Sequence, residues 1–350
     1  MRRIKDRDYL ESQERLIFTV VGYLHPEDRA VAYLKYIPSP EGRWRRSDGY
    51  YQRVLRTYSV PSVWETEDYL RKNYPEYLFR SEFIGTETTC VPLHRILRWY
   101  RPEEKLAELS TSARLDSLQA KSIHLAEAIS HSAGVPLSTL GLTGSIVLGL
   151  HNPSFSDIDL TVYGYDNAVK VRSALREMMV SDTSSIKPFD GARAERWCID
   201  KERIHPISRR DAAKILQRKW GKGVFQGSEF SVHPIRDDSE IHESYGDRIF
   251  RPVGLVTVEV EVTDSSESLF LPAIYKICVR RDVSQPLAAD VSELVSFEGL
   301  YCDSAYDGER VLVRGMLEKV VDTRSGADSA RIVVGAHEAG GTDFIRILNG

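Results

Sequence analysis

The sequence predicts an α/β (α+β) protein in three parts: an N-terminal α+β domain over residues 1–100, a core over 101–245 and a C-terminal β-rich domain over 246–350. Three observations indicate this fold class. Two β-rich runs and a helical run occupy the first hundred residues, helical and strand patterns alternate across the core, and alternating valines begin after Gly254. A chain of 350 residues is also long for a single hydrophobic core.

In the first hundred residues the patterns predict a hairpin followed by a helix. Residues 16–24 and 31–37 are β-rich, and His25-Pro26 opens a turn between them. Residues 64–73 have a helical pattern that ends before Pro75. These features predict a small α+β unit.

The core begins with a helical stretch over 103–132, which Gly134 and Pro136 stop. Short strands and helices then alternate. The expected elements are a strand over 140–143, a short helix over 145–150, a strand over 157–163, helices over 166–179 and 208–220, and a strand over 229–235.

From Gly254 onward the pattern changes to strands. Val256, Val258, Val260 and Val262 alternate with polar residues, which is the period of a half-buried strand. Further strands are expected over 270–279, 310–320 and 330–334. This pattern predicts a C-terminal β-domain, for which a small barrel is one arrangement.

Composition is ordinary for a globular protein and singles out no partner. Hydrophobic residues make up 42% and charged residues 28% of the chain, and the formal net charge is −4. A nucleic-acid contact would therefore have to come from a local basic patch. The four cysteines are far apart, which argues against a zinc knuckle and against a disulfide framework.

Targeting and membrane patterns are not found. Residues 1–9 lack the apolar centre of a signal peptide. No apolar run approaches the roughly 18 residues of a membrane span. We therefore expect a cytoplasmic protein without membrane contact.

The most informative motif combines Gly144-Ser145 with Asp157-Ile158-Asp159. Side chains two apart on a strand project from one face, so Asp157 and Asp159 point the same way. Paired carboxylates repel one another unless a cation lies between them, and Mg²⁺, or Mn²⁺ in its place, also holds substrate phosphates. Gly144 permits a sharp turn, and Ser145 at a helix N-terminus favours phosphate. We predict Asp157 and Asp159 as catalytic metal ligands, with Gly144 and Ser145 binding the phosphates.

Neither half of this motif is specific alone. An Asp-x-Asp pair also occurs at solvated strand ends, and Gly-Ser is common. The order strand, Gly-Ser turn, helix, loop and Asp-x-Asp strand is much more specific. We therefore favour a phosphate and metal site over an incidental solvated pair.

The segment 140–160 resembles the signature of the DNA polymerase beta-type nucleotidyltransferase superfamily. Over most of its length the chain also resembles a group of uncharacterised archaeal predicted nucleotidyltransferases, through residues 16–29, 74–79 and 266–272. The resemblance implies a nucleotidyltransferase core with a mixed sheet and the Gly-Ser helix beside it. It also implies an enzyme that moves a nucleoside monophosphate from an NTP to a hydroxyl acceptor and releases pyrophosphate.

Superfamily members typically carry a third carboxylate on a later strand, and this chain departs from that pattern. The next core strand has Ser231 and His233 at its alternate positions, and His233 is a candidate base or a structural histidine. Glu259 and Glu261 are neighbours on one face of the valine strand. We favour a solvated face for them, because a half-buried strand ordinarily shows charges opposite its apolar side. The third metal ligand is left unassigned among these candidates.

Two basic segments suggest where an RNA or DNA acceptor would bind. The helix near Arg209–Lys222 is rich in Lys and Arg, which suits a phosphate backbone or an NTP tail and, slightly better, a solvated face. Residues 43–53 mix cations and aromatics, as single-stranded nucleic-acid binders do, and equally fit a loop whose Trp44 packs on its own domain. His151 and Asn152 are expected in the loop before the aspartates.

Two alternatives to this function are kept. The missing third carboxylate favours a catalytically degenerate relative that only binds nucleic acid. Alternatively, the chemistry is retained and the acceptor is a protein side chain or a small molecule.

Overall fold

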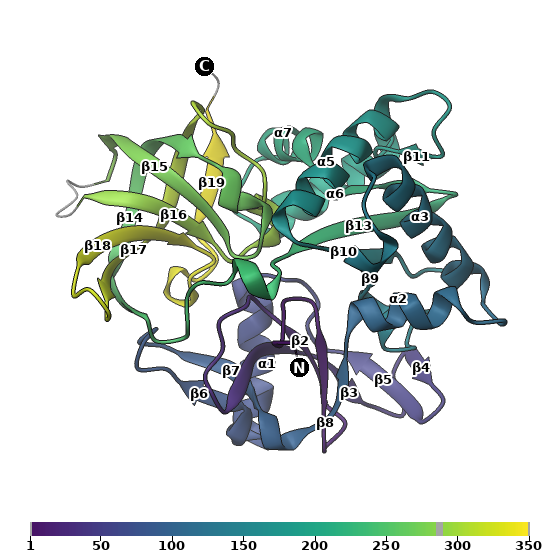
Figure 1. Ribbon diagram of the computed structural model, residues 1–350. Helices are drawn as coiled ribbons and strands as arrows, with labels where there is room; N and C mark the ends of the chain where they lie inside the picture. Colours follow the sequence, from purple (N-terminus) through teal and green to yellow (C-terminus); the bar gives the residue numbers. More distant parts are fainter. Residues whose placement is uncertain (1, 285–289, 349–350) are drawn as a thin grey trace.

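The computed structural model describes residues 2–284 and 290–348 and contains three β-sheets, with most of the helices gathered around the middle one (Figure 1). The N-terminal sheet, the core sheet and the C-terminal sheet follow one another along the chain. The mixed α/β fold class predicted from the sequence is confirmed.

Residues 9–100 form an eight-stranded sheet, with α1 (Val60–Asn73) packed against it. The predicted hairpin is present, because β2 (Ile17–Val20) and β3 (Arg29–Pro38) pair antiparallel. The main order is β4-β5-β3-β2-β1-β8, and β7 pairs with β3 and β6. The other strands are β1 (Tyr9–Ser12), β4 (Trp44–Arg46), β5 (Gly49–Arg53), β6 (Leu78–Arg80), β7 (Glu87–Pro92) and β8 (Ile96–Tyr100).

The core is a five-stranded sheet in the order β11-β12-β13-β10-β9. Strands β10 (Ile158–Tyr163) and β13 (Ser228–Ile235) are parallel and all other neighbours are antiparallel, so the sheet is mixed. Apolar residues of α3 (Ser117–Ala133) and α5 (Tyr165–Val180) pack with those of β10 in one buried cluster. The remaining strands are β9 (Leu140–Leu142), β11 (Ile186–Lys187) and β12 (Lys222–Phe225).

The single helical stretch expected over 103–132 is two helices, α2 (Pro102–Ser110) and α3 (Ser117–Ala133). Asp116 begins the second, because its side chain accepts hydrogen bonds from the backbone N–H of Leu118 and Gln119 at 2.8 and 3.0 Å. An N-cap residue has an extended backbone, with φ −77° and ψ 174° here, and this interrupts the helix. Apolar spacing continues across the break, so periodicity alone did not indicate it.

Helix α6 (Gly191–Ile204) was not predicted. Only Cys198 of its residues is buried, so no apolar stripe marks it in the sequence. It packs beside α7 (Arg209–Arg218), which Ser208 caps through the backbone N–H of Asp211 at 3.1 Å. The predicted basic helix over 208–220 is therefore present in slightly shorter form.

The C-terminal sheet closes into a barrel. Strand β14 (Arg248–Asp264) pairs with β15 on one side and with β17 on the other, and β16 and β18 complete the ring. The four alternating valines of β14 are buried inside. The other strands are β15 (Ala273–Asp282), β16 (Val291–Ser296), β17 (Arg310–Asp322), β18 (Asp328–Val334) and β19 (Phe344–Ile347).

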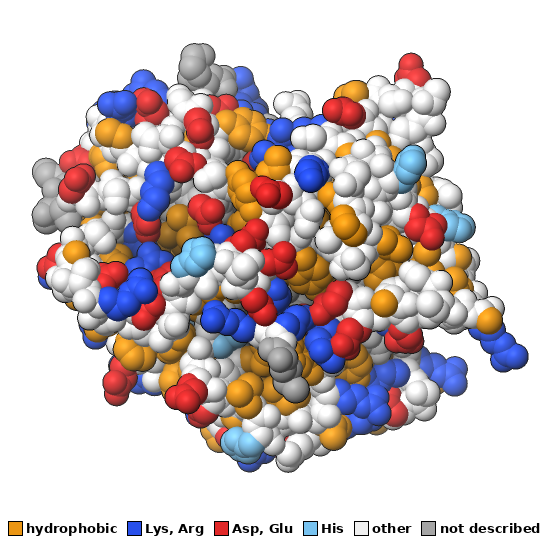
Figure 2. Space-filling view, viewed as in Figure 1, with side chains coloured by type: hydrophobic (Ala, Val, Ile, Leu, Met, Phe, Trp, Pro, Cys, Tyr) orange, Lys and Arg blue, Asp and Glu red, His pale blue; other side chains and the backbone are white. Residues whose placement is uncertain are grey.

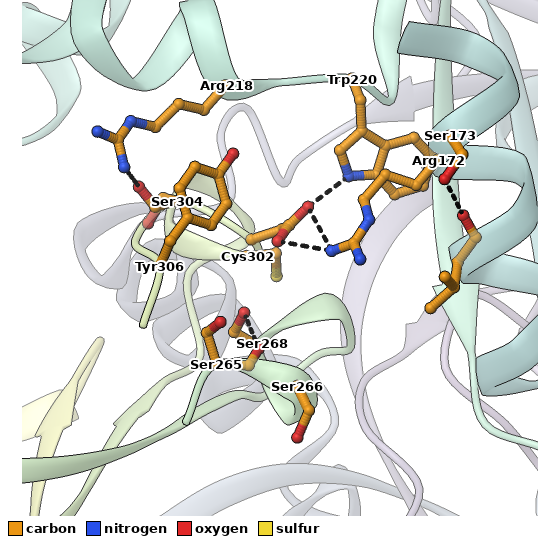
Figure 3. A network of polar contacts seen from close by, with 12 residues as sticks. Arg172, Ser173, Arg218, Trp220, Ser265, Ser266, Ser268, Cys302, Ser304 and Tyr306 are labelled. Carbon is orange, nitrogen blue, oxygen red and sulfur yellow. Dashed lines mark hydrogen bonds and ion pairs between the residues drawn. The ribbon is translucent and has the colours of Figure 1, made fainter. Parts of the chain in front are cut away.

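Buried and partly buried polar contacts join the core to the barrel (Figure 3). The Asp303 carboxylate accepts hydrogen bonds from Trp220 Nε1 at 2.8 Å and from Arg172 at 3.1 Å. Arg218, at the end of α7, forms a bidentate ion pair with Glu309. These contacts fix the barrel against α5 and α7.

Positive and negative side chains are interspersed across the face shown in Figure 2, as the counts of 47 Lys and Arg and 51 Asp and Glu lead one to expect. Among the helices described, none is long and apolar enough to cross a membrane. All four cysteines are free thiols.

Candidate functional site

A tight turn between β9 and α4 (Gly144–Val147) forms one wall of the candidate site. Gly144 has φ +68°, and a Cβ built on it would lie 2.2 Å from Oδ2 of Asp159. Both the backbone conformation and the space therefore require glycine. The backbone N–H of Thr143 donates to the Asp159 carbonyl at 2.9 Å and holds the turn against β10.

Helix α4 is shorter than the expected 145–150. It has four residues, so few peptide dipoles are aligned behind its N-terminus. The helix dipole at Ser145 is therefore small. Phosphate binding at Ser145 would depend on N–H groups, the hydroxyl and nearby cations.

The two aspartates lie on the cavity side of β10. Asp157 directly precedes the strand and Asp159 is its second residue. Ile158, Leu160 and Val162 point into the apolar core, so the aspartates project from the opposite face. Asp157 and Asp159 both line a cavity of about 740 Å³, together with Gly144 and Ser145. The four predicted residues are thus brought together.

The aspartates differ in their affinity for protons. Repulsion from Asp159, together with burial, raises the pKa of Asp157 to about 6. Burial opposes ionisation of Asp159 as well, but interactions with His233 and Ser231 outweigh it and hold the pKa of Asp159 below its usual range. Such a pair accommodates a proton or a metal cation, whose charge relieves the repulsion.

Ser231 and His233 hold Asp159 in place. The parallel register of β10 and β13 sets Ser231 beside Asp159, and the Ser231 hydroxyl donates a short hydrogen bond to its Oδ1. His233 Nε2 lies 2.8 Å from Ser231 Oγ and 3.8 Å from Asp159 Oδ1. Since Ser231 donates to the carboxylate, His233 donates to Ser231. Burial and the charge of Arg7 lower the pKa of His233 to about 4, so the ring is neutral at pH 7.

The other candidates for a third ligand lie elsewhere. Glu259 pairs with Arg310 and with Arg281, and Glu261 pairs with Arg280 at 2.9 Å on the barrel. Neither glutamate lines the cavity. Within residues 2–284 and 290–348, no group of three or more His, Cys, Asp or Glu is arranged to hold a metal. The protein donors at this site are two carboxylates with a serine beside them.

Residues of all three parts of the chain line the cavity. The N-terminal part contributes Arg7, Lys35 and Arg53, β12 contributes Lys222, and the barrel contributes residues around Glu298. Sequence reasoning assigned Arg7 and Lys35 to no site, and it named Arg53 only as part of the cationic and aromatic segment 43–53. No local signal could have placed the three beside the aspartates, because only the packing of the N-terminal part on the core brings them there.

Most cations of the predicted basic helix contact the protein itself. Arg209 pairs with Glu202 at 3.0 Å, Arg218 pairs with Glu309, and Lys219 Nζ donates to the Cys302 carbonyl at 2.6 Å. Burial lowers the pKa of Lys219 to about 8. Lys219 and Lys222 also line the cavity, so the C-terminal end of this segment faces the site.

The other segments singled out in the sequence have structural contacts. Trp44 packs edge-on against Tyr36, with ring centroids 5.7 Å apart, so it belongs to its own sheet. Arg46 pairs with Glu11 at 2.7 Å. His151 Nε2 lies 2.7 Å from the Asp116 carboxylate at the start of α3. His151 does not line the cavity.

Comparisons with known proteins agree with this geometry. Residues 125–196, which include the Gly144 turn and both aspartates, match the family model described as "Nucleotidyltransferase domain". The chain therefore carries a nucleotidyltransferase domain, which supports nucleotidyl transfer as its general activity. It is also 30% identical over 350 residues to an uncharacterized protein of Methanocaldococcus jannaschii, with 99% of each chain covered. The chain belongs to the same family as this archaeal protein. No solved structure matches it.

Proposed function

We propose that this protein is a metal-dependent enzyme that transfers a nucleoside monophosphate from an NTP to a hydroxyl acceptor. The observation that carries the proposal is the convergence on one cavity of four residues of the matched segment, Gly144, Ser145, Asp157 and Asp159. In this reaction the acceptor oxygen bonds to the α-phosphorus, the bond from the α-phosphorus to the β-phosphate oxygen breaks, and pyrophosphate leaves. The hydroxyl proton is released.

Asp157 and Asp159 would hold a divalent cation, Mg²⁺ or Mn²⁺. Their oxygens are hard donors, both face the cavity, and the repulsion that raises the pKa of Asp157 is what a bound cation would relieve. Mg²⁺ commonly binds one or two carboxylates and completes its shell with water and substrate phosphates. Two carboxylates without a third therefore fit such an ion.

The protein groups have separate tasks in this proposal. Ser231 and His233 keep the Asp159 carboxylate oriented and ionised. The Gly144 turn lets phosphate approach the backbone, and Ser145 offers a hydroxyl. The cation, when bound, orients the triphosphate, neutralises charge on the transferred phosphate and lowers the pKa of the attacking hydroxyl.

Labelled nucleotides test the transfer. Wild-type protein should incorporate α-labelled NTP into an acceptor in the presence of Mg²⁺, and Asp157→Asn and Asp159→Asn should each reduce incorporation at least about 100-fold. Glu261→Gln, on the barrel, is the matched control and should retain activity. Full activity in both aspartate variants contradicts the proposal.

A second candidate is a degenerate relative that binds nucleic acid without catalysis. The specific observation in its favour is Ser231, which stands beside Asp159 where a third carboxylate is typical. Isothermal titration with NTP, with and without Mg²⁺, separates the two candidates. The enzyme should show Mg²⁺-dependent NTP affinity, and the degenerate relative should show none.

The acceptor is proposed to be a nucleic-acid end, with Lys219 and Lys222 at the cavity as the nearest cations of the basic segment. A protein side chain or a small molecule is the alternative acceptor. Incubating the protein with α-labelled NTP and separate RNA, DNA and protein pools identifies the class. Label in the RNA or DNA pool supports a nucleic-acid acceptor, and label confined to another pool contradicts it.

A further inference from the structure

Three cations of the N-terminal part face the same cavity as the aspartates. Lys35 lies on β3, Arg53 ends β5, and Arg7 lies before β1. Lys35 is only 6% exposed, and the Arg7 side chain is 17% exposed. Long cationic side chains usually keep their charged ends in water, so buried cations turned toward a cavity need a counter-charge.

For Lys35 and Arg53 the protein supplies that counter-charge without a close ion pair, because Asp157 and Asp159 of the same cavity act on them only over longer distances. Lys35 Nζ donates to the Tyr9 hydroxyl and lies 4.9 and 5.4 Å from the ring centres of Tyr9 and Tyr58. Arg53 Nε donates to the Leu55 carbonyl at 2.8 Å. In the part of the chain that the structure describes, neither cation has a carboxylate within ion-pair distance.

Arg7 is only partly compensated. Its Nε lies 3.4 Å from the Asp6 carboxylate without a hydrogen bond, and the atom is buried. A buried guanidinium nitrogen without a hydrogen-bond partner costs free energy that a bound anion would recover. Among the residues that the structure describes, Arg7 has one loose ion pair, and Lys35 and Arg53 have none, so a phosphate in the cavity would be their close counter-charge.

The N-terminal sheet is fixed directly against the Gly-Ser turn. Apolar residues of α4 and the loop after it pack with the sheet in one buried cluster, which consists of Tyr9, Ile17, Tyr36, Tyr51, Val147, Leu148 and Leu150. The Thr143 hydroxyl donates to the Arg7 carbonyl at 2.8 Å, one residue before Gly144. The cations are thus held beside the turn where phosphate is expected, and α4 is too short to bind that phosphate by its dipole.

We propose that Arg7, Lys35 and Arg53 bind the β- and γ-phosphates of the nucleoside triphosphate, so that the N-terminal part completes the substrate site. The proposal rests on the proposed function, because it names the part of the same substrate that this cluster recognises. The chemistry recognised is a run of closely spaced phosphates. A nucleic-acid acceptor also carries phosphates, and the experiment distinguishes the two sources.

Titration of the full-length protein with inorganic tripolyphosphate, without metal, tests the cluster. Lys35→Met and Arg53→Met should each weaken tripolyphosphate binding at least about tenfold, because each removes a charge-assisted hydrogen bond. Lys170→Met and Arg196→Met are matched controls, because both residues are exposed and neither lines the cavity. The controls should bind as the wild type does. Both variants should lose affinity for ATP by a similar factor as for tripolyphosphate. Their affinity for AMP, which lacks the β- and γ-phosphates, should change little.

Unchanged tripolyphosphate affinity in folded Arg53→Met overturns the proposal. So does a loss of binding for a short oligonucleotide while tripolyphosphate binding is unaltered. If Lys35→Met does not fold because Lys35 is buried, Arg53→Met still tests the proposal, because Arg53 is only half-buried. Failure of nucleotidyl transfer would appear as absent incorporation of labelled NTP, and it would leave the metal-free tripolyphosphate result unaffected.

Discussion

The position of the Asp159 carboxylate is set from several sides by single residues. Ser231 donates to one of its oxygens, His233 supports Ser231, and Gly144 leaves room for the other oxygen. A side chain held in this way loses little conformational freedom when it binds a ligand. The residue-scale predictions concern this carboxylate and its neighbour Asp157.

Gly144→Ala should damage the site more than the fold. The new Cβ would meet Asp159 Oδ2 at 2.2 Å, and an L-residue at φ +68° costs about 1–2 kcal/mol. We expect loss of Mg²⁺-dependent NTP binding by titration and a destabilisation of about 1–3 kcal/mol in urea. Gly191→Ala is the control, because nothing lies within 4 Å of its Cβ position and alanine favours α6. Normal NTP binding by Gly144→Ala would show that the turn is not part of the site.

Metal binding should depend on pH through Asp157. Repulsion from Asp159 raises the pKa of Asp157 to about 6, so below that pH a proton competes with the metal. Mn²⁺ affinity, measured by titration calorimetry, should rise about tenfold for each pH unit up to about pH 6 and then level off. In Asp159→Asn the repulsion is gone, so the residual affinity should lose this dependence. A Mn²⁺ affinity that is constant from pH 5 to pH 7 in the wild type contradicts the prediction.

At the scale of elements, two packing relationships build the site. The parallel register of β10 and β13 sets Ser231 beside Asp159, and α4 packs against the N-terminal sheet. A third relationship fixes the barrel to the core through Asp303, which is 4% exposed and accepts from Trp220 and Arg172. The buried Asp303 carboxylate thus links the barrel to α5, through Arg172, and to the segment after α7, through Trp220.

Asp303→Ala should loosen the barrel from α5 and α7. It leaves a buried indole N–H and a partly buried guanidinium without their acceptor, at a cost of about 3–5 kcal/mol. Asp303→Asn retains an oxygen acceptor and tolerates the φ of +47° at this position, so it should cost clearly less. Urea denaturation of both variants measures the difference. Equal and small effects would show that the contact does not hold the barrel in place.

At the scale of the whole molecule, three separate sheets meet at one cavity. The catalytic candidates come from the core, the cations Arg7, Lys35 and Arg53 come from the N-terminal part, and the barrel supplies the far wall. Glu67 on α1 also lies 3.3 Å from His337 of the C-terminal part, so the two outer parts touch each other. A ligand in the cavity would therefore contact more than one part of the fold.

Calorimetry should show this coupling as one unfolding transition. ATP with Mg²⁺ at about 100 times its dissociation constant should stabilise the folded protein by about 2.7 kcal/mol and shift the whole transition upward. The Asp157→Asn/Asp159→Asn double variant should unfold as one transition without the Mg²⁺-dependent shift. Two transitions, of which only one responds to ATP, would mean that the parts unfold independently.

The predictions of helices and strands were correct where local sequence patterns are strong. The alternating valines of β14, the hairpin of β2 and β3, and the core strands β9, β10 and β13 follow directly from periodicity and turn residues, whereas the short strands β11 and β12 were not predicted. The break at Asp116 and the polar helix α6 did not, because capping interrupts an unbroken apolar spacing and a helix with one buried residue has no stripe.

The candidate site also has residues that the sequence predicted and residues that it did not. Gly144, Ser145, Asp157 and Asp159 were recognisable because they lie within one short segment whose order of turn, helix and strand has a direct physical meaning. The orientation of Asp159 by Ser231 and His233 depends on the register between two strands that α5, α6 and α7 separate in the chain. The position of Arg7, Lys35 and Arg53 at the same cavity depends on the packing of the N-terminal part against the core. The sequence by itself therefore determines the residues of the motif, because they lie close together along the chain. The charges and hydrogen bonds around them are decided by the tertiary structure, because they come from segments that are distant in the sequence.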